Sequence, residues 1–117
     1  MPSTLIAGDL EPDLLVPLYE PHSTIDGARQ PIDLTGVQLV ELVWRRPGAT
    51  DAVILPATVH GAATAGQVAH TWAAGETDDL GLHRYLVRLT WPGGERQHVP
   101  SDGTSYTLLV SPAAIAG

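Results

Sequence analysis

Apolar and polar residues alternate along much of this chain, and a period of two is typical of half-buried β-strands. In residues 67–72, Val68, His70 and Trp72 fall on one side of an extended backbone. In residues 82–91 the odd-numbered positions, from His83 to Trp91, form one face of a longer strand. Both segments predict strands with one face in the core.

A third strand is predicted at residues 40–45, where Val40, Leu42 and Trp44 share a side. Extending the alternation back to Val37 and Leu39 breaks the parity. Because one extra residue turns every later side chain to the opposite face, this break predicts a bulge near Leu39.

Two further strand candidates contain proline. Residues 14–20 carry Pro17, and residues 52–59 carry Pro56. Proline has no amide hydrogen to donate to a neighbouring strand, so it belongs at an edge or a bulge. We therefore expect both strands to lie outside the centre of the sheet.

Glycine and proline mark the turns between these segments. Asp26-Gly27 predicts a turn, and Pro31 a second reversal. Pro92-Gly93-Gly94 predicts a hairpin after Trp91, because glycine accepts the positive φ of tight hairpins. Residues 72–81 form either a short helical turn or a loop, with the adjacent Asp78 and Asp79 in solvent.

The last strand follows two breaks in quick succession. Pro100 stops ladder bonding, and residues 101–103 (Ser-Asp-Gly) redirect the chain. Residues 105–110 then place Tyr106, Leu108 and Val110 on one face.

These segments predict one all-β domain, a β-sandwich of about seven short antiparallel strands. A length of 117 residues fits a single domain. The sandwich is expected at residues 12–110, between an N-terminal arm at 1–11 and a C-terminal tail at 111–117. The chain has no cysteine, which excludes a disulfide framework, a thiol nucleophile and a thiolate zinc site.

Charge narrows the range of partners. Thirteen acids and six scattered arginines give a formal net charge of −7, with no lysine and no basic stripe. Phosphate backbones require clustered cations, so nucleic acid is not an expected partner, and the acidic surface disfavours anionic lipid. The N-terminal residues lack the pattern of a signal peptide, and no apolar run approaches the roughly 20 residues of a membrane span. We expect a soluble chain made in the cytoplasm.

Five histidines are the first candidates for chemistry: His22, His60, His70, His83 and His98. None forms an i, i+4 helical pair or a His-x-His pair on a strand. His70 and His83 share parity with Trp72 and Tyr85, so we expect each to be an imidazole at the edge of the core with one hydrogen bond. No nucleophile elbow or glycine-rich phosphate loop followed by a helix is present.

Acidic residues offer a second candidate. Asp9, Glu11, Asp13 and Glu20 fall at positions 1, 3, 5 and 12 of a calcium loop of the EF-hand type. Leu14 occupies the sixth position, where the sharp turn requires glycine, so calcium binding is not expected. No catalytic, cofactor-binding or metal-binding residue is therefore predicted.

The tryptophans could form a sugar-stacking platform. Trp44, Trp72 and Trp91 nevertheless all have inward parity on their strands, and the chain has no phenylalanine. They are the expected bulky core residues.

Five ordered segments together resemble the immunoglobulin-like domain at the N-terminus of phage baseplate upper proteins. The segments are IDGARQPIDLTG (25–36), VELVWR (40–45), GQVAHTWAAGETDDLG (66–81), LTWPGG (89–94) and VPSDGTSYTLLV (99–110). The chain departs from the family pattern at Leu42, Trp44, His70, His83 and Glu76-Thr77. The resemblance covers about residues 12–110.

This resemblance implies an immunoglobulin-like sandwich that docks on or decorates the tail or baseplate of a virion, without catalysis and without a cofactor. Its expected partners are other virion proteins or copies of itself, with no nucleic acid and no membrane. Contact is expected through edge strands or loops, with residues 3–10 or the tail becoming ordered on assembly. A capsid decoration protein and a carbohydrate-binding accessory domain for host-surface adhesion remain alternatives.

Overall fold

The computed structural model describes residues 3–11, 13–25, 28–100 and 104–111. These residues contain ten strands, one 3-10 turn (Ala63–Ala65) and no α-helix. The strands are β1 (Ser3–Ile6), β2 (Leu14–Pro17), β3 (Tyr19–Ile25), β4 (Ala28–Pro31), β5 (Leu39–Arg45), β6 (Val53–Val59), β7 (Gln67–His70), β8 (Gly81–Thr90), β9 (Arg96–Val99) and β10 (Tyr106–Ser111). The prediction of an all-β chain is confirmed.

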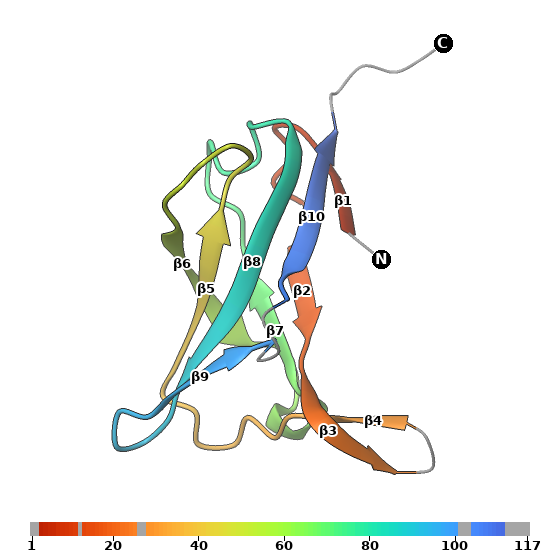
Figure 1. Cartoon of the computed structure of the whole chain (residues 1–117), viewed down its shortest axis with the longest axis vertical. Helices are drawn as coiled ribbons and strands as arrows, with labels where there is room; N and C mark the ends of the chain where they lie inside the picture. Colours follow the sequence, from red (N-terminus) through yellow and green to blue (C-terminus); the bar gives the residue numbers. More distant parts are fainter. Residues whose placement is uncertain (1–2, 12, 26–27, 101–103, 112–117) are drawn as a thin grey trace.

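Eight strands form one curled sheet in the order β1-β10-β8-β5-β6-β7-β2, with β9 alongside β8 (Figure 1). Strands β3 and β4 form a separate hairpin that projects from one end. The sheet is mixed, because β1 runs parallel to β10 while the other pairs are antiparallel. The structure thus differs from the expected seven antiparallel strands in both number and direction.

Strands β5 and β8 form the centre of the sheet. They pair without interruption from Leu39 opposite Thr90 to Arg45 opposite Arg84. The predicted inward residues of both strands are buried: Val40, Leu42, Trp44, His83, Tyr85, Val87 and Leu89. Period-two alternation therefore identified the core face correctly.

The bulge expected near Leu39 is wrong. Leu39 is the first residue of β5 and already pairs in register. Val37 precedes the strand, and its N–H donates to the carbonyl of Leu34. The parity changes because the chain turns there, before the strand begins.

Pro17 and Pro56 have different surroundings. Pro17 ends β2, which is an edge strand as predicted. Pro56 lies in β6, between β5 and β7, so it is not on an edge strand, although β6 lies outside the β5–β8 centre as expected. It faces Glu41 on β5, whereas β7 pairs with β6 only at Thr58 and Val59. Proline is tolerated there because the second ladder does not extend to that position.

The hairpin predicted at residues 91–96 is confirmed. Strands β8 and β9 pair antiparallel, and the Trp91 N–H donates to the Glu95 carbonyl at 2.8 Å. Gly93 and Gly94 have φ values of 95° and 87°. Residues 101–103, the second predicted break, lie outside the described residues.

Two other connections were predicted from the sequence. The residues of the turn predicted at 26–27 lie outside the described residues, while β3 and β4 on either side pair antiparallel. Residues 71–80 form a loop rather than a helix, with Asp78 and Asp79 exposed.

The N-terminal segment belongs to the sheet. β1 pairs with residues 108–111 of β10, and Leu5 is part of the core. Beyond β1, the Gly8 N–H donates to the Thr77 carbonyl, and the Thr77 hydroxyl donates to the Asp9 carbonyl. An arm ending at residue 11 is therefore not what the structure contains, because residues 3–6 gain backbone partners within the chain. The C-terminal tail was predicted to begin at residue 111, but Ser111 is the last residue of β10. Residues 112–117 lie outside the described residues.

One glycine fixes the packing of the loops at the end of the core. Gly66 follows the 3-10 turn with φ of 68°, and a Cβ there would lie 2.8 Å from the carbonyl oxygen of Ile32 and 2.9 Å from that of Leu18. Its carbonyl accepts the Leu18 N–H. Three segments distant in sequence meet at this point, and only glycine leaves room for them.

Candidate functional site

The four candidate histidines whose side chains the structure describes do not form a cluster. His70 and His83 are buried, His60 and His98 are exposed, and the side chain of His22 lies outside the described residues. Within the described part of the chain, no three histidine or acidic side chains are grouped so as to hold a metal ion.

His83 has two partners in the core rather than the single one expected. Its Nδ1 accepts the indole N–H of Trp44 at 3.1 Å, and its Nε2 lies 2.9 Å from the carbonyl oxygen of Asp79. Because a carbonyl only accepts, Nε2 carries the proton and Nδ1 does not. Both contacts together select the neutral Nε2–H tautomer.

His70 also has two partners. Its Nδ1 meets the carbonyl oxygen of Pro56, and its Nε2 lies 2.8 Å from Oε1 of Glu76. The same carboxyl oxygen accepts the Ala73 N–H at 2.7 Å. His70 thus bridges the gap where β6 and β7 diverge and anchors the loop that follows β7.

The aromatic residues form a continuous cluster between the two sides of the curled sheet. Trp44 stacks on Tyr85, with ring centroids 5.0 Å apart, and meets Trp72 edge-on at 5.6 Å. Both tryptophans are buried, as predicted. Trp91 is only partly buried against the core, and its Nε1 donates to Gln97. It follows directly on the last residue of β8, so the core prediction for Trp91 is only partly met.

The acidic residues at calcium-loop spacing form no cage. Asp9, Glu11 and Asp13 are exposed, whereas Leu14 is buried as the first residue of β2. Elsewhere, Asp33 accepts hydrogen bonds from the side chain and backbone N–H of Thr35, which lower the pKa of its carboxyl group. This contact is a local turn in solvent rather than a binding site.

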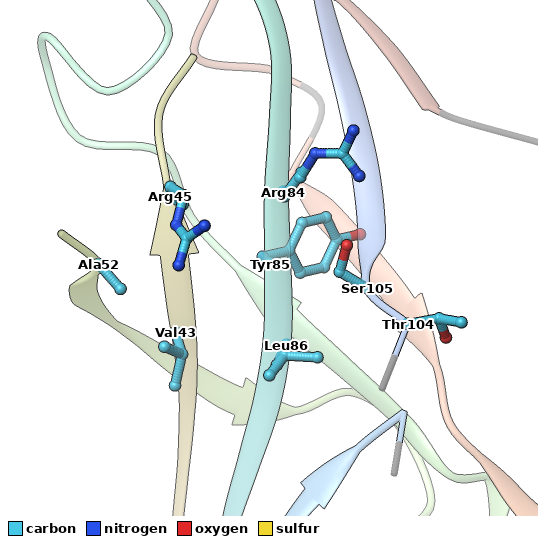
Figure 2. A pocket seen from close by; sticks show the side chains of 8 residues that line it. All are labelled: Val43, Arg45, Ala52, Arg84, Tyr85, Leu86, Thr104 and Ser105. Atoms are coloured by element: carbon cyan, nitrogen blue, oxygen red, sulfur yellow. The ribbon is translucent and has the colours of Figure 1, made fainter. Parts of the chain in front are cut away.

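A hollow of about 250 Å³ lies on the outer face of the sheet. We call it the arginine hollow; it is lined by Val43, Arg45, Ala52, Arg84, Tyr85, Leu86, Thr104 and Ser105. In Figure 2 the Arg45 guanidinium lies over β5, while that of Arg84 extends toward β10. The two arginines are directly opposite each other in the β5–β8 register, and both are exposed.

Like charges directly opposite on paired strands destabilise a sheet. Within the described part of the chain, neither Arg45 nor Arg84 has an ion-pair partner. Arg88, four residues further along β8 and on the same face, pairs with Glu41 at 2.7 Å. In a chain with formal net charge −7, two adjacent arginines without a carboxylate are an unbalanced cationic spot.

Apolar side chains lie on both sides of this arginine pair. One row crosses three strands as Ile54, Val43 and Leu86, and a second pairs Leu82 with Leu109. Ile54 is 46% exposed, and Leu82 and Leu109 are 37% and 38% exposed. The outer face therefore combines exposed apolar area with two guanidinium groups, and arginine is enriched in protein interfaces.

The inner wall of the hollow connects it to the core. Tyr85 lines the hollow while its ring stacks on Trp44, and burial raises the pKa of its phenol, with Tyr106 adding to the effect. Sequence parity had already placed Arg45 and Arg84 on the outward sides of their strands. It gave no indication that they face each other, because register depends on the pairing of distant segments.

Comparisons with family models, with curated proteins and with solved structures found no match. Among the described residues, no helix has the length and apolar character needed to cross a membrane.

Proposed function

We propose that this protein is a non-enzymatic structural component of a phage virion, an immunoglobulin-like module that docks on or decorates the tail or baseplate. The resemblance of residues 12–110 to baseplate upper proteins motivates the location. Decoration of the capsid by the same kind of module is the nearest alternative.

The observation that carries a docking role is the outer face of β5, β8 and β10. It holds the unpaired Arg45 and Arg84 between two rows of partly exposed aliphatic side chains. A partner that supplies carboxylates and covers the aliphatic rows would remove both the like-charge repulsion and the exposed apolar area. This face lies on β5 and β8, which pair without interruption from Leu39 to Arg45.

A carbohydrate-binding role has less support. Stacking on sugars needs exposed aromatic faces, yet Trp44 and Trp72 are buried and Trp91 is partly covered. The guanidinium of Arg29 lies over the ring of the partly buried Tyr19, 4.6 Å from the ring centroid, so that ring face is already in contact with a side chain. The tryptophans therefore contribute to folding rather than to a sugar platform.

The first experiment asks whether the protein is in the particle. Gradient-purified virions of the phage that encodes it are analysed by quantitative mass spectrometry, and we expect the protein at a fixed copy number per particle. Its absence from intact virions would reject the structural role.

The second experiment asks whether the outer face makes the contact. Particles are assembled with the Arg45→Glu/Arg84→Glu variant or with Arg96→Glu, which reverses an exposed arginine on β9 outside the hollow. We expect the double variant to be lost from particles and the control to be retained. Retention of both would show that docking uses another surface.

A further inference from the structure

The arginine hollow needs an acidic, partly apolar occupant, and this chain itself displays one. Asp9 and Glu11 are exposed on the connection between β1 and β2, with Leu10 between them 39% exposed. Within the described residues, neither carboxylate has an ion-pair partner. The segment thus offers two unpaired carboxylates beside an exposed leucine.

Its composition complements that of the hollow. The two guanidinium groups of the hollow match the two carboxylates of the segment in number and are opposite in charge. Val43 and Leu86 provide an apolar surface for the leucine side chain. The Asp9 carbonyl accepts the Thr77 hydroxyl, which holds the segment at the end of the sheet where β8 begins. The segment is therefore presented in a fixed place.

We propose that the arginine hollow of one copy binds the Asp9–Glu11 segment of a second copy. The two surfaces are different, so the contact is head-to-tail and not reciprocal within one pair of molecules. Repetition of such a contact produces a ring where the rotation closes and an open chain where it does not. This inference deepens the proposed function, since it names the partner at the same face.

Net charge makes the association weak in dilute solution. Copies with formal net charge −7 repel one another, while the arginine hollow attracts the acidic segment locally. We expect self-association only at high protein concentration, or when a particle surface brings copies together, and expect it to weaken as salt screens the contact.

Sedimentation velocity over a range of protein concentrations, at low and high salt, tests the proposal with two complementary variants. The hollow variant is Arg45→Glu/Arg84→Glu, and the segment variant is Asp9→Arg/Glu11→Arg. Wild type is expected to form dimers and larger species at high concentration and low salt, whereas each variant alone remains monomeric. Circular dichroism checks that both variants are folded.

Mixing the two variants gives the decisive result. The hollow variant keeps an intact acidic segment, and the segment variant keeps an intact hollow. Their mixture is expected to form alternating dimers and larger species, because the intact segment of one variant fits the intact hollow of the other and the two reversed surfaces are again opposite in charge. A mixture that stays monomeric overturns the head-to-tail contact.

Charge alone does not explain the expected loss. Each of the two reversals in the segment variant changes the charge by +2. Together they move the formal net charge from −7 to −3 and reduce repulsion between copies. Loss of association despite that reduction would identify the segment as the contact. Association that persists in this variant would reject it, as would a wild type that is monomeric at every concentration.

The control Glu95→Arg/Arg96→Glu keeps the formal net charge at −7, changes exposed charges at the β8–β9 turn that line neither surface, and should associate like wild type. Failure of this inference is distinguishable from failure of the proposed function. A monomeric wild type that is nevertheless present in virions contradicts only the self-contact. A protein missing from virions contradicts the function whatever its behaviour in solution.

Discussion

The indole N–H of Trp44 donates to Nδ1 of His83, and the two residues lie on neighbouring positions of the core although they are 39 residues apart in sequence. Both are almost completely buried, at 2% and 0% exposure. A buried donor that loses its acceptor costs about 1–3 kcal/mol. The hydrogen bond therefore satisfies the indole N–H of Trp44 and Nδ1 of His83, so both side chains can be buried in the core without an unsatisfied polar group.

Replacing His83 with Leu should lower the free energy of unfolding by about 1–3 kcal/mol, because the indole N–H of Trp44 is left without an acceptor. In a Trp44→Phe background the same substitution should cost less, since no donor remains to be satisfied. Urea unfolding of the four proteins in this double-mutant cycle measures the difference. Equal costs in both backgrounds would show that the hydrogen bond contributes nothing.

Alkaline pH should unfold this protein through Tyr85. Burial raises the pKa of its phenol above the usual value of 10.0, so the folded state keeps the proton that the unfolded state loses. The resulting stability is fully present below pH 10 and falls as the pH rises above it. Tyr85→Phe should flatten the decline, as measured by urea unfolding from pH 8 upward. The control Tyr19→Phe, on the β3–β4 hairpin, should leave the wild-type decline unchanged.

Gly66 should tolerate no side chain. Gly66→Ala places a Cβ within 3.0 Å of the backbone of Ile32 and Leu18, in addition to a positive φ of 68°. Gly61 is a matched control, because its φ is 69° and a Cβ there meets nothing within 4 Å. Gly61→Ala should cost only the left-handed backbone penalty of about 1–2 kcal/mol, and Gly66→Ala distinctly more. Thermal unfolding compares the melting temperatures of the two variants. Similar melting temperatures would contradict the close packing around Gly66.

Glu76 should stabilise the loop after β7. Its Oε1 contacts both the His70 ring and the Ala73 N–H, and removal of a hydrogen-bonded charged group costs about 1.5–3 kcal/mol. Glu76→Ala should therefore lower the free energy of unfolding by that amount, whereas Glu95→Ala, an exposed acid in the β8–β9 turn, should change it little. Urea unfolding at neutral pH compares the two. A small effect at Glu76 would mean that His70 is held by Pro56 alone.

Local pattern was enough to predict the strands that form the centre of the sheet and their inward faces, although not β1, β3 or β4. Parity at Val40, Leu42 and Trp44, and at alternate residues from His83 to Leu89, depends only on the extended backbone, and the structure confirms it. The glycines after Trp91 were equally informative, because positive φ is a local requirement.

Pairing between distant segments could not be predicted. The parallel contact of β1 with β10 and the place of Pro56 between β5 and β7 both depend on which strands become neighbours. The second hydrogen bond of each buried histidine and the juxtaposition of Arg45 with Arg84 have the same origin. Spacing within one segment carries no information about these relations.

The parallel pairing of β1 with β10 has a mechanical consequence. A pull transmitted through the residues before Ser3 and after Ser111 would draw the two strands in opposite directions along their length. The hydrogen bonds between them would then be loaded together rather than broken one after another, as they would be at the open end of an antiparallel hairpin. The geometry therefore suits a module that must hold while tension passes from one attachment to the next.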